Sequence, residues 1–138
     1  MPDLSITAAS VAVYADVAPR DGTAGATITA GQVLYEDTSD SNKLKLADCD
    51  SSSATATVVG IALHGASSGQ PIKYAPSGEL TIGATVTVGE LYVLSGTAGG
   101  IAPEGDLASG DYVTFLGVGS TAARIRFNIL NSGVQVPA

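Results

Sequence analysis

Charged side chains are scarce in this chain. Asp, Glu, Lys and Arg together make up 14% of its 138 residues, whereas ordinary globular domains contain about 25%. A protein with so few charges has little polar material with which to cover its surface, so we expect part of its apolar surface to be buried against other chains. The alternative is a monomer that its many Ser and Thr hydroxyls keep soluble.

Basic residues are the scarcest of the charged groups. Six Lys and Arg stand against thirteen Asp and Glu, which gives a net charge of −7. Neutralising a phosphate backbone requires clustered Lys and Arg, but here the six are scattered. No apolar run approaches the length that spans a membrane, and the N-terminus lacks the basic region and apolar core of a signal peptide. We therefore expect neither a nucleic-acid partner nor a membrane partner.

Cysteine occurs once, at Cys49. A single cysteine excludes an intramolecular disulfide and any metal site built from several thiolates. Its neighbours Asp48 and Asp50 are acidic, and their charges predict a raised thiol pKa and low reactivity. These features are consistent with synthesis in a reducing cytosol.

The chain contains a long internal repeat. The phrase GATITAGQVL at 25–34 returns as GATVTVGELY at 83–92, displaced by 58 positions. Two triplets also return downstream: Val59-Gly60-Ile61 as Leu116-Gly117-Val118, and Ile72-Lys73-Tyr74 as Ile125-Arg126-Phe127. A period of this length indicates a duplicated structural unit.

Strand-forming residues dominate the pattern. Val, Ile and Thr are frequent, straight-chain helix formers are few, and 17 glycines and 6 prolines supply turns along the whole length. The sequence predicts an all-β domain, a β-sandwich or barrel-like structure built from two similar repeats with a short N-terminal arm. We expect a single domain over 1–138, divided into an arm at 1–9, repeats at 25–82 and 83–130, and a tail at 131–138. Strands are expected near 10–18, 43–46, 54–63, 71–75, 91–94, 111–118 and 122–130, with a strand pair over 26–35 broken at 30–31 and a turn at 19–24.

One short motif suggests catalysis. Residues 65–69 match G-x-S-x-G around Ser67, and His64 precedes them. A nucleophile elbow needs a strand before the serine and a helix after it, but here Pro71 opens a strand. We interpret the motif as an inter-strand loop, with a small serine hydrolase as a remote alternative. We assign no catalytic residue and no cofactor, and we predict that the protein is not an enzyme.

An acidic stretch over 36–50 is rich in oxygen ligands. It lacks the central glycine and the terminal glutamate of an EF-hand loop, and Lys43 and Lys45 interrupt its ligand series. We interpret it as a solvated loop and assign no metal site. A structural cation remains the alternative.

The repeated segments resemble the small capsid decoration (cement) proteins of tailed bacteriophages. The resemblance covers about 25–130 and lies in a pattern of small and apolar residues. The segments that carry it are Thr29-Ala30-Gly31-Gln32-Val33-Leu34-Tyr35, Val59-Gly60-Ile61-Ala62-Leu63, Gly83 through Val93, and Phe115-Leu116-Gly117-Val118.

The resemblance implies a non-enzymatic structural protein, commonly a homotrimer. Such a protein is made in the bacterial host cytoplasm and binds the major capsid protein on the outer surface of the virion, stabilising the head. An extended arm can add a strand to the sheet edge of a capsid protein. Residues 1–8 have too few apolar residues in register to join the core. We therefore expect the capsid contact in the arm, at Pro2, Asp3, Leu4, Ser5, Ile6 and Thr7. The alternative function is a phage tail, fibre or receptor-binding β module, which usually exposes aromatic rings to sugars.

Overall fold

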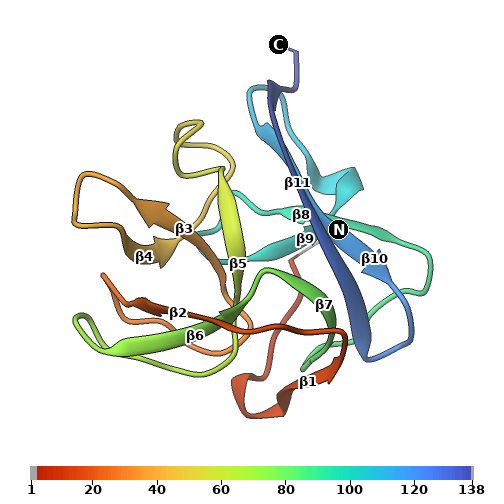
Figure 1. Ribbon diagram of the computed structural model, residues 1–138. Coiled ribbons are helices and arrows are strands. Elements are labelled where there is room, and N and C mark those ends of the chain that lie inside the picture. Colours follow the sequence, from red (N-terminus) through yellow and green to blue (C-terminus); the bar gives the residue numbers. More distant parts are fainter. Residues whose placement is uncertain (1–2, 138) are drawn as a thin grey trace.

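The computed structural model describes residues 3–137 and is all-β (Figure 1). Strands hold 47% of the residues, and the described part of the chain contains two short 3-10 turns and no α-helix. The predicted fold class is therefore confirmed. The elements in order are η1 (Ala8–Ser10), β1 (Val11–Ala15), β2 (Arg20–Thr23), β3 (Val33–Asp37), β4 (Lys43–Leu46), β5 (Val58–Ala62), β6 (Pro71–Ala75), β7 (Ser77–Ile82), β8 (Leu91–Leu94), β9 (Ile101–Pro103), η2 (Glu104–Asp106), β10 (Tyr112–Gly119) and β11 (Arg124–Gln135).

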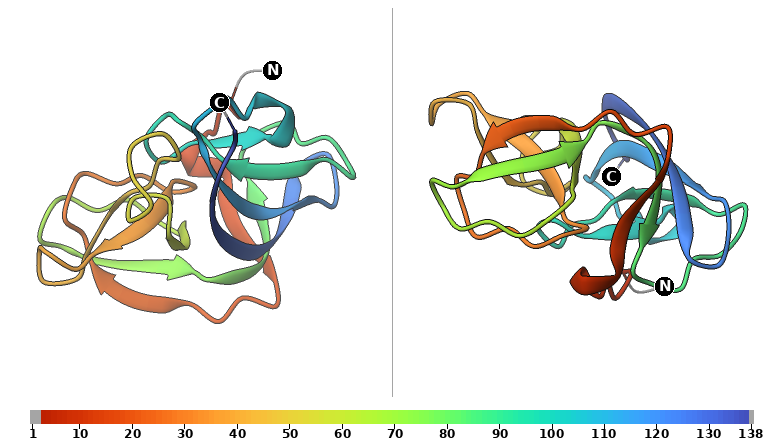
Figure 2. Two further views of the ribbon diagram at one scale, coloured as in Figure 1. Left: turned by 90° about the horizontal axis from the view of Figure 1, so that it is seen from above. Right: turned by 60° about the horizontal axis from the view of Figure 1, so that its bottom comes forward.

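The strands form two antiparallel sheets that pack together as in a β-sandwich. One sheet has five strands in the order β2-β6-β5-β3-β4, and the other has six in the order β1-β7-β11-β10-β8-β9. Figures 1 and 2 show them as two neighbouring lobes. We call the lobe of the five-stranded sheet the first lobe and that of the six-stranded sheet the second lobe.

The main core joins the two lobes. Sixteen buried residues form one apolar cluster, including Val33 and Ile61 from the first lobe and Tyr92, Leu116 and Phe127 from the second. A separate, smaller cluster fills the inside of the first lobe. The first lobe buries the smaller cluster by itself but shares the main one with the second lobe, so each lobe depends on the other for part of its core.

The two sheets share one order of strand pairing. The order β2-β6-β5-β3-β4 corresponds strand by strand to β7-β11-β10-β8-β9, and β1 is an addition beside β7. The registers match as well: Val33 pairs with Ile61 in the first lobe, and Leu91 pairs with Val118 in the second. The sequence repeat therefore ends on strands in corresponding positions, whereas 25–32 and 83–90 lie in the loops before β3 and β8. The strand pair expected over 26–35 is thus wrong for its first part, because β3 begins only at Val33. Whether 25–75 superposes on 83–130 in three dimensions stays a prediction.

A glycine occupies the same place in both central strands. Gly60 pairs with Leu34, and Gly117 pairs with Tyr92. A Cβ on Gly60 would lie 2.6 Å from the carbonyl oxygen of Ala75, and one on Gly117 would overlap the backbone of the neighbouring strand β11. The close approach of adjacent strands requires glycine at both positions.

The two lobes are closed differently. In the first lobe the edge strands meet, because Ala24 forms a parallel bridge with Leu44 and the Gly25 N–H donates to the Leu44 carbonyl at 2.7 Å. In the second lobe the N-terminal arm lies between the edges. The Leu4 N–H donates to the carbonyl of Ile101 on β9 at 2.9 Å, and the Thr7 N–H donates to Gly83, just after β7, at 2.8 Å.

Two expected irregular segments are strands. The expected turn at 19–24 contains β2, which pairs with β6, and the expected tail at 131–138 begins with the last residues of β11. Asn131 explains the longer strand: its amide donates to the Val58 carbonyl at 3.0 Å and accepts from the Val58 N–H at 2.8 Å. Because this side chain ties β11 to β5, the end of the strand stays against the first lobe.

Candidate functional site: the N-terminal arm and an exposed sheet face

The arm lies on the body of the protein. Leu4 and Ile6 are partly buried and pack against the main core, whereas the sequence predicts too few apolar residues there to join it. That expectation is wrong. An extended segment points alternate side chains to one side, and in the arm this side faces the second lobe between β9 and the end of β7. Of the other predicted contact residues, Ser5 and Thr7 are exposed, and Pro2 lies outside the described residues.

Asp3 fixes the start of the arm. Its carboxylate accepts a hydrogen bond from the Ser95 hydroxyl at 2.6 Å, and Ser95 in turn accepts from the Thr97 N–H at 3.0 Å. Ser95 is buried, so this hydrogen bond forms where water competes little and contributes to holding the arm in place. Among the described residues of the predicted contact, Ser5 and Thr7 point outward and can meet a partner while the arm stays docked.

The large exposed apolar side chains lie in the second lobe. Those in the described part of the chain are Val13, Tyr14, Val88, Leu91, Val118, Leu130 and Val134. All of them belong to the six-stranded sheet or to the loop before β8. An uneven distribution of this kind marks an interaction surface more strongly than single apolar residues do.

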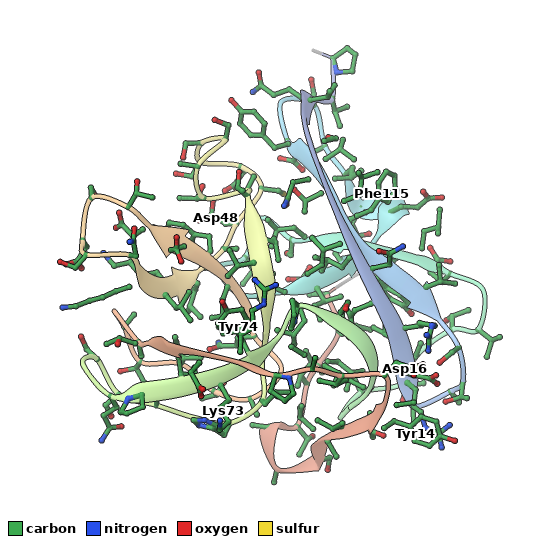
Figure 3. All side chains as sticks on the ribbon, viewed as in Figure 1. Tyr14, Asp16, Asp48, Lys73, Tyr74 and Phe115 are labelled. Carbon is green, nitrogen blue, oxygen red and sulfur yellow. The ribbon has the colours of Figure 1, made fainter. Side chains whose placement is uncertain are left out.

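Three of these residues and Phe115 form a continuous area, which we call the open face. Phe115 pairs with Leu130, and Val118 pairs with Leu91. Leu91, Val118 and Leu130 are 38%, 41% and 59% exposed, and together with Phe115 they line a shallow groove of about 310 Å³. Figure 3 shows Phe115 on the second lobe, away from Lys73 and Tyr74 on the first.

The open face carries one charged side chain, Arg126, and its groove has no carboxylate in its lining. Arg126 is held from the side, 2.8 Å from Asp16 and 3.5 Å from Glu79. The hydrogen bond to Asp16 is the main reason that the pKa of Arg126 is raised. Because Arg126 is paired with Asp16 and Glu79, its guanidinium forms a polar edge of the open face and is not an unpaired charge.

The contacts of His64 do not activate Ser67. The Nδ1 atom of His64 lies 2.8 Å from the Gly65 carbonyl oxygen, and its Nε2 atom accepts a hydrogen bond from the Lys73 N–H at 3.0 Å. With Nδ1 donating and Nε2 accepting, the ring has no lone pair left to take a proton from Ser67. The Ser67 N–H donates to the Gln70 side chain at 2.8 Å. These hydrogen bonds stabilise a turn.

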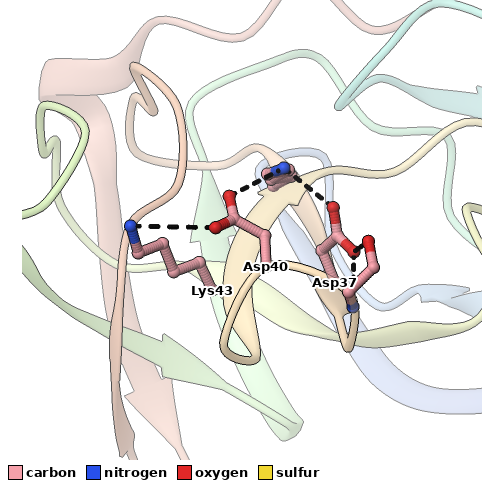
Figure 4. A network of polar contacts seen from close by, with 5 residues as sticks. Asp37, Asp40 and Lys43 are labelled. Carbon is pink, nitrogen blue, oxygen red and sulfur yellow. Dashed lines mark hydrogen bonds and ion pairs between the residues drawn. The ribbon is translucent and has the colours of Figure 1, made fainter.

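Two carboxylates of the acidic loop, Asp37 and Asp40, are paired with lysine (Figure 4). Lys45 lies 2.8 Å from Asp37 and 3.1 Å from Asp40, and Lys43 lies 3.9 Å from Asp40. The hydrogen bond from Lys45, followed by that from Ser39, lowers the pKa of Asp37 from 3.8 to about 2. Lysine nitrogens therefore occupy the positions that a cation would need. Residues 3–137 contain no group of three or more His, Cys, Asp or Glu side chains that could hold a metal ion.

Cys49 is buried, with 1% of its surface exposed. Burial, followed by the charges of Asp111 and Asp50, raises the pKa of its thiol to about 12. The sequence predicts the direction of this shift from the adjacent carboxylates. It does not reveal the larger cause, burial, or the contribution of Asp111, which the fold brings close from 62 positions away.

Comparison with protein-family models and with curated proteins finds no match to this chain. Within residues 3–137, no helix has the length and apolar character needed to cross a membrane.

Proposed function

We propose that this protein is a structural capsid decoration (cement) protein of a tailed bacteriophage. It binds the major capsid protein on the outer surface of the head as a homotrimer and stabilises the shell, after synthesis in the host cytoplasm. It is not an enzyme and needs no cofactor. The observation that carries the proposal is the open face: an acidic chain with few charges presents a continuous apolar area without carboxylates.

The resemblance to cement proteins supplies the class of partner. The residues that carry it lie on β3, β5, β8 and β10, which are inner strands of the two sheets, and in the loops that lead into β3 and β8. These segments build the scaffold, and Leu91, Phe115 and Val118 among them also belong to the open face, which with the arm is the surface left for partners. A structural protein needs such surfaces, whereas an enzyme needs a cleft with oriented polar groups.

The alternative function, a receptor-binding module, requires aromatic rings that can stack on sugars. Tyr14 is the most exposed aromatic side chain in the described residues, at 55%. The guanidinium of Arg124 lies 3.5 Å from the centroid of its ring, so one face of the ring is already occupied. This contact favours a structural role for Tyr14.

The proposal is tested by incubating the purified protein with undecorated capsids of its own virus and sedimenting the mixture. We expect saturable binding and capsids that withstand heat or chelator better than undecorated ones. A protein that stays in the supernatant at saturating concentration, or that binds without changing capsid stability, would contradict the proposed function.

The arm is tested with a pair of outward substitutions, Ser5→Arg and Thr7→Arg. Because both side chains are exposed, we expect the double variant to melt near the wild-type temperature and to bind capsids more weakly. A matched control is Ser109→Arg, an exposed position in the loop before β10. If the arm variant and the control bind capsids equally well, the arm is not the contact.

A further inference from the structure

The first lobe has a counterpart of the open face, and that counterpart is buried. Val33 and Ile61 pair across β3 and β5 and are both 0% exposed. They belong to the core cluster that joins the lobes. In the first lobe, the side of the sheet that carries Val33 and Ile61 is therefore covered by the second lobe.

In the second lobe the corresponding row is uncovered. Leu91 and Val118 pair in the same register as Val33 and Ile61, and both are at least 38% exposed. A third pair of positions shows the same correspondence. Val58, which is buried, lies in the β3–β5 pairing where Phe115 lies in the β8–β10 pairing, and each of the two residues is next to a register shift. The second lobe thus keeps apolar residues on a side that, in the first lobe, is buried by protein.

From this correspondence we propose that the open face is the self-association surface of the protein and that its occupant is the same face of a second copy of this chain. The inference rests on the proposed function in so far as that function requires a homo-oligomer. Copies placed around a symmetry axis would turn Leu91, Phe115, Val118 and Leu130 toward that axis. Each copy would then bury Leu91 and Val118, just as the corresponding Val33 and Ile61 are already buried inside the molecule.

Charge selects the open face among the surfaces on which two copies could meet. Each chain has a net charge of −7, so most ways of bringing two copies together place carboxylates near carboxylates, which is repulsive. The groove of the open face has no carboxylate in its lining, and its Arg126 is already paired with Asp16 and Glu79. Copies that meet here bury apolar side chains at the centre and keep the charged groups at the rim, as protein interfaces do.

The experiment is light scattering on the full chain, with substitutions on the face and away from it. At micromolar concentration we expect the wild-type protein to have a mass of about three times the 13.6 kDa chain. Val118→Glu and Leu130→Glu each place a carboxylate on the face, so we expect each to weaken self-association about tenfold or more. The control is Val13→Glu on β1, at the far edge of the same sheet, where the side chain is 51% exposed.

A wild-type dimer or trimer that both face substitutions dissociate, and that Val13→Glu leaves intact, supports the inference. A wild-type protein with the mass of one chain overturns it, and so does an oligomer that survives both face substitutions. An oligomer dissociated by Val13→Glu but not by Val118→Glu would place the contact at the edge strand. Circular dichroism checks that each variant is folded, and the two face variants guard against the misfolding of either one. A stable oligomer that binds no capsid leaves the inference standing and removes the proposed function, whereas a capsid-binding monomer does the reverse.

Discussion

The close approach of β10 and β11 makes Gly117 sensitive to substitution. A Cβ at this position would overlap the carbonyl oxygen of Arg126 and would lie 2.9 Å from the Cα of Phe127. Both atoms belong to the backbone, so no side-chain rotation relieves the contact. We therefore expect Gly117→Ala to push the two strands apart locally, although alanine is otherwise a small and well-tolerated residue.

The magnitude follows from two opposing effects. Overpacking a tight site costs about 1–3 kcal/mol, and the hydrogen bonds that weaken as the strands separate add about 1 kcal/mol each. Alanine offsets about 0.4–1 kcal/mol by restricting the unfolded chain. We expect a net loss of about 2 kcal/mol, which corresponds to a fall in melting temperature of about 6–10 °C for a domain of this size.

The assay is thermal unfolding followed by circular dichroism, with Gly105→Ala as the matched control. Gly105 has no atom within 4 Å of an added Cβ, so its variant should melt close to the wild-type protein. We expect Gly60→Ala to resemble Gly117→Ala, because its Cβ would lie 2.6 Å from the Ala75 carbonyl oxygen. If Gly117→Ala melts within about 2 °C of Gly105→Ala, less than 1 kcal/mol is involved and the strand-spacing argument is refuted.

Four further outcomes are expected. Leu4→Ala should lower the free energy of unfolding by about 1–2 kcal/mol in chemical denaturation, because a half-buried leucine leaves the core; an unchanged midpoint would show that the arm is not docked. Ser67→Ala and His64→Ala should leave capsid binding unchanged in sedimentation, and stoichiometric labelling of the serine by a serine-directed probe would contradict this. Asp37→Asn should reduce the fall in the free energy of unfolding between pH 3.8 and about 2. The lowered pKa of Asp37 gives the wild-type protein stability that is present above this window and lost as the carboxylate is protonated. Cys49 should react with a thiol reagent only on unfolding, since its thiol is buried and its pKa is raised to about 12; rapid labelling of the folded protein would refute this.

The sequence repeat predicts much of the strand arrangement but misses its first member. Residues 20–23 read as a turn because they contain Asp21 and Gly22. In the structure they form β2, which pairs with β6 and occupies the position that β7 holds in the second lobe. This strand is formed by pairing with its neighbour, so tertiary hydrogen bonds override the local turn preference. Gly22 is needed there for space, because a Cβ would lie 2.6 Å from the side chain of Leu44.

The open face could not be predicted from strand alternation. Thr114, a polar residue in β10, is buried and donates a hydrogen bond to the Ala56 carbonyl at 2.6 Å, whereas its apolar neighbour Phe115 points to the outer side. A register shift between Phe115 and Gly117 then moves Val118 to that side as well. Pattern reading assumes a strict period of two, and a bulge breaks that period. Which side of β10 faces solvent is settled only when the other sheet is in place.

Both lobes carry ion pairs, which in the second lobe join Arg126 to Asp16 and Glu79, but the lobes differ in exposed apolar surface. The first lobe carries ion pairs on its outside, with Lys45 beside Asp37 and Lys73 2.8 Å from Asp21. The exposed large apolar residues of the described chain belong to the second lobe and its flanking loop. Since corresponding strands build both lobes, the fold itself does not require this difference. Exposed apolar surface suits a protein contact, so the second lobe would face its partners and the first lobe would point away from the assembly.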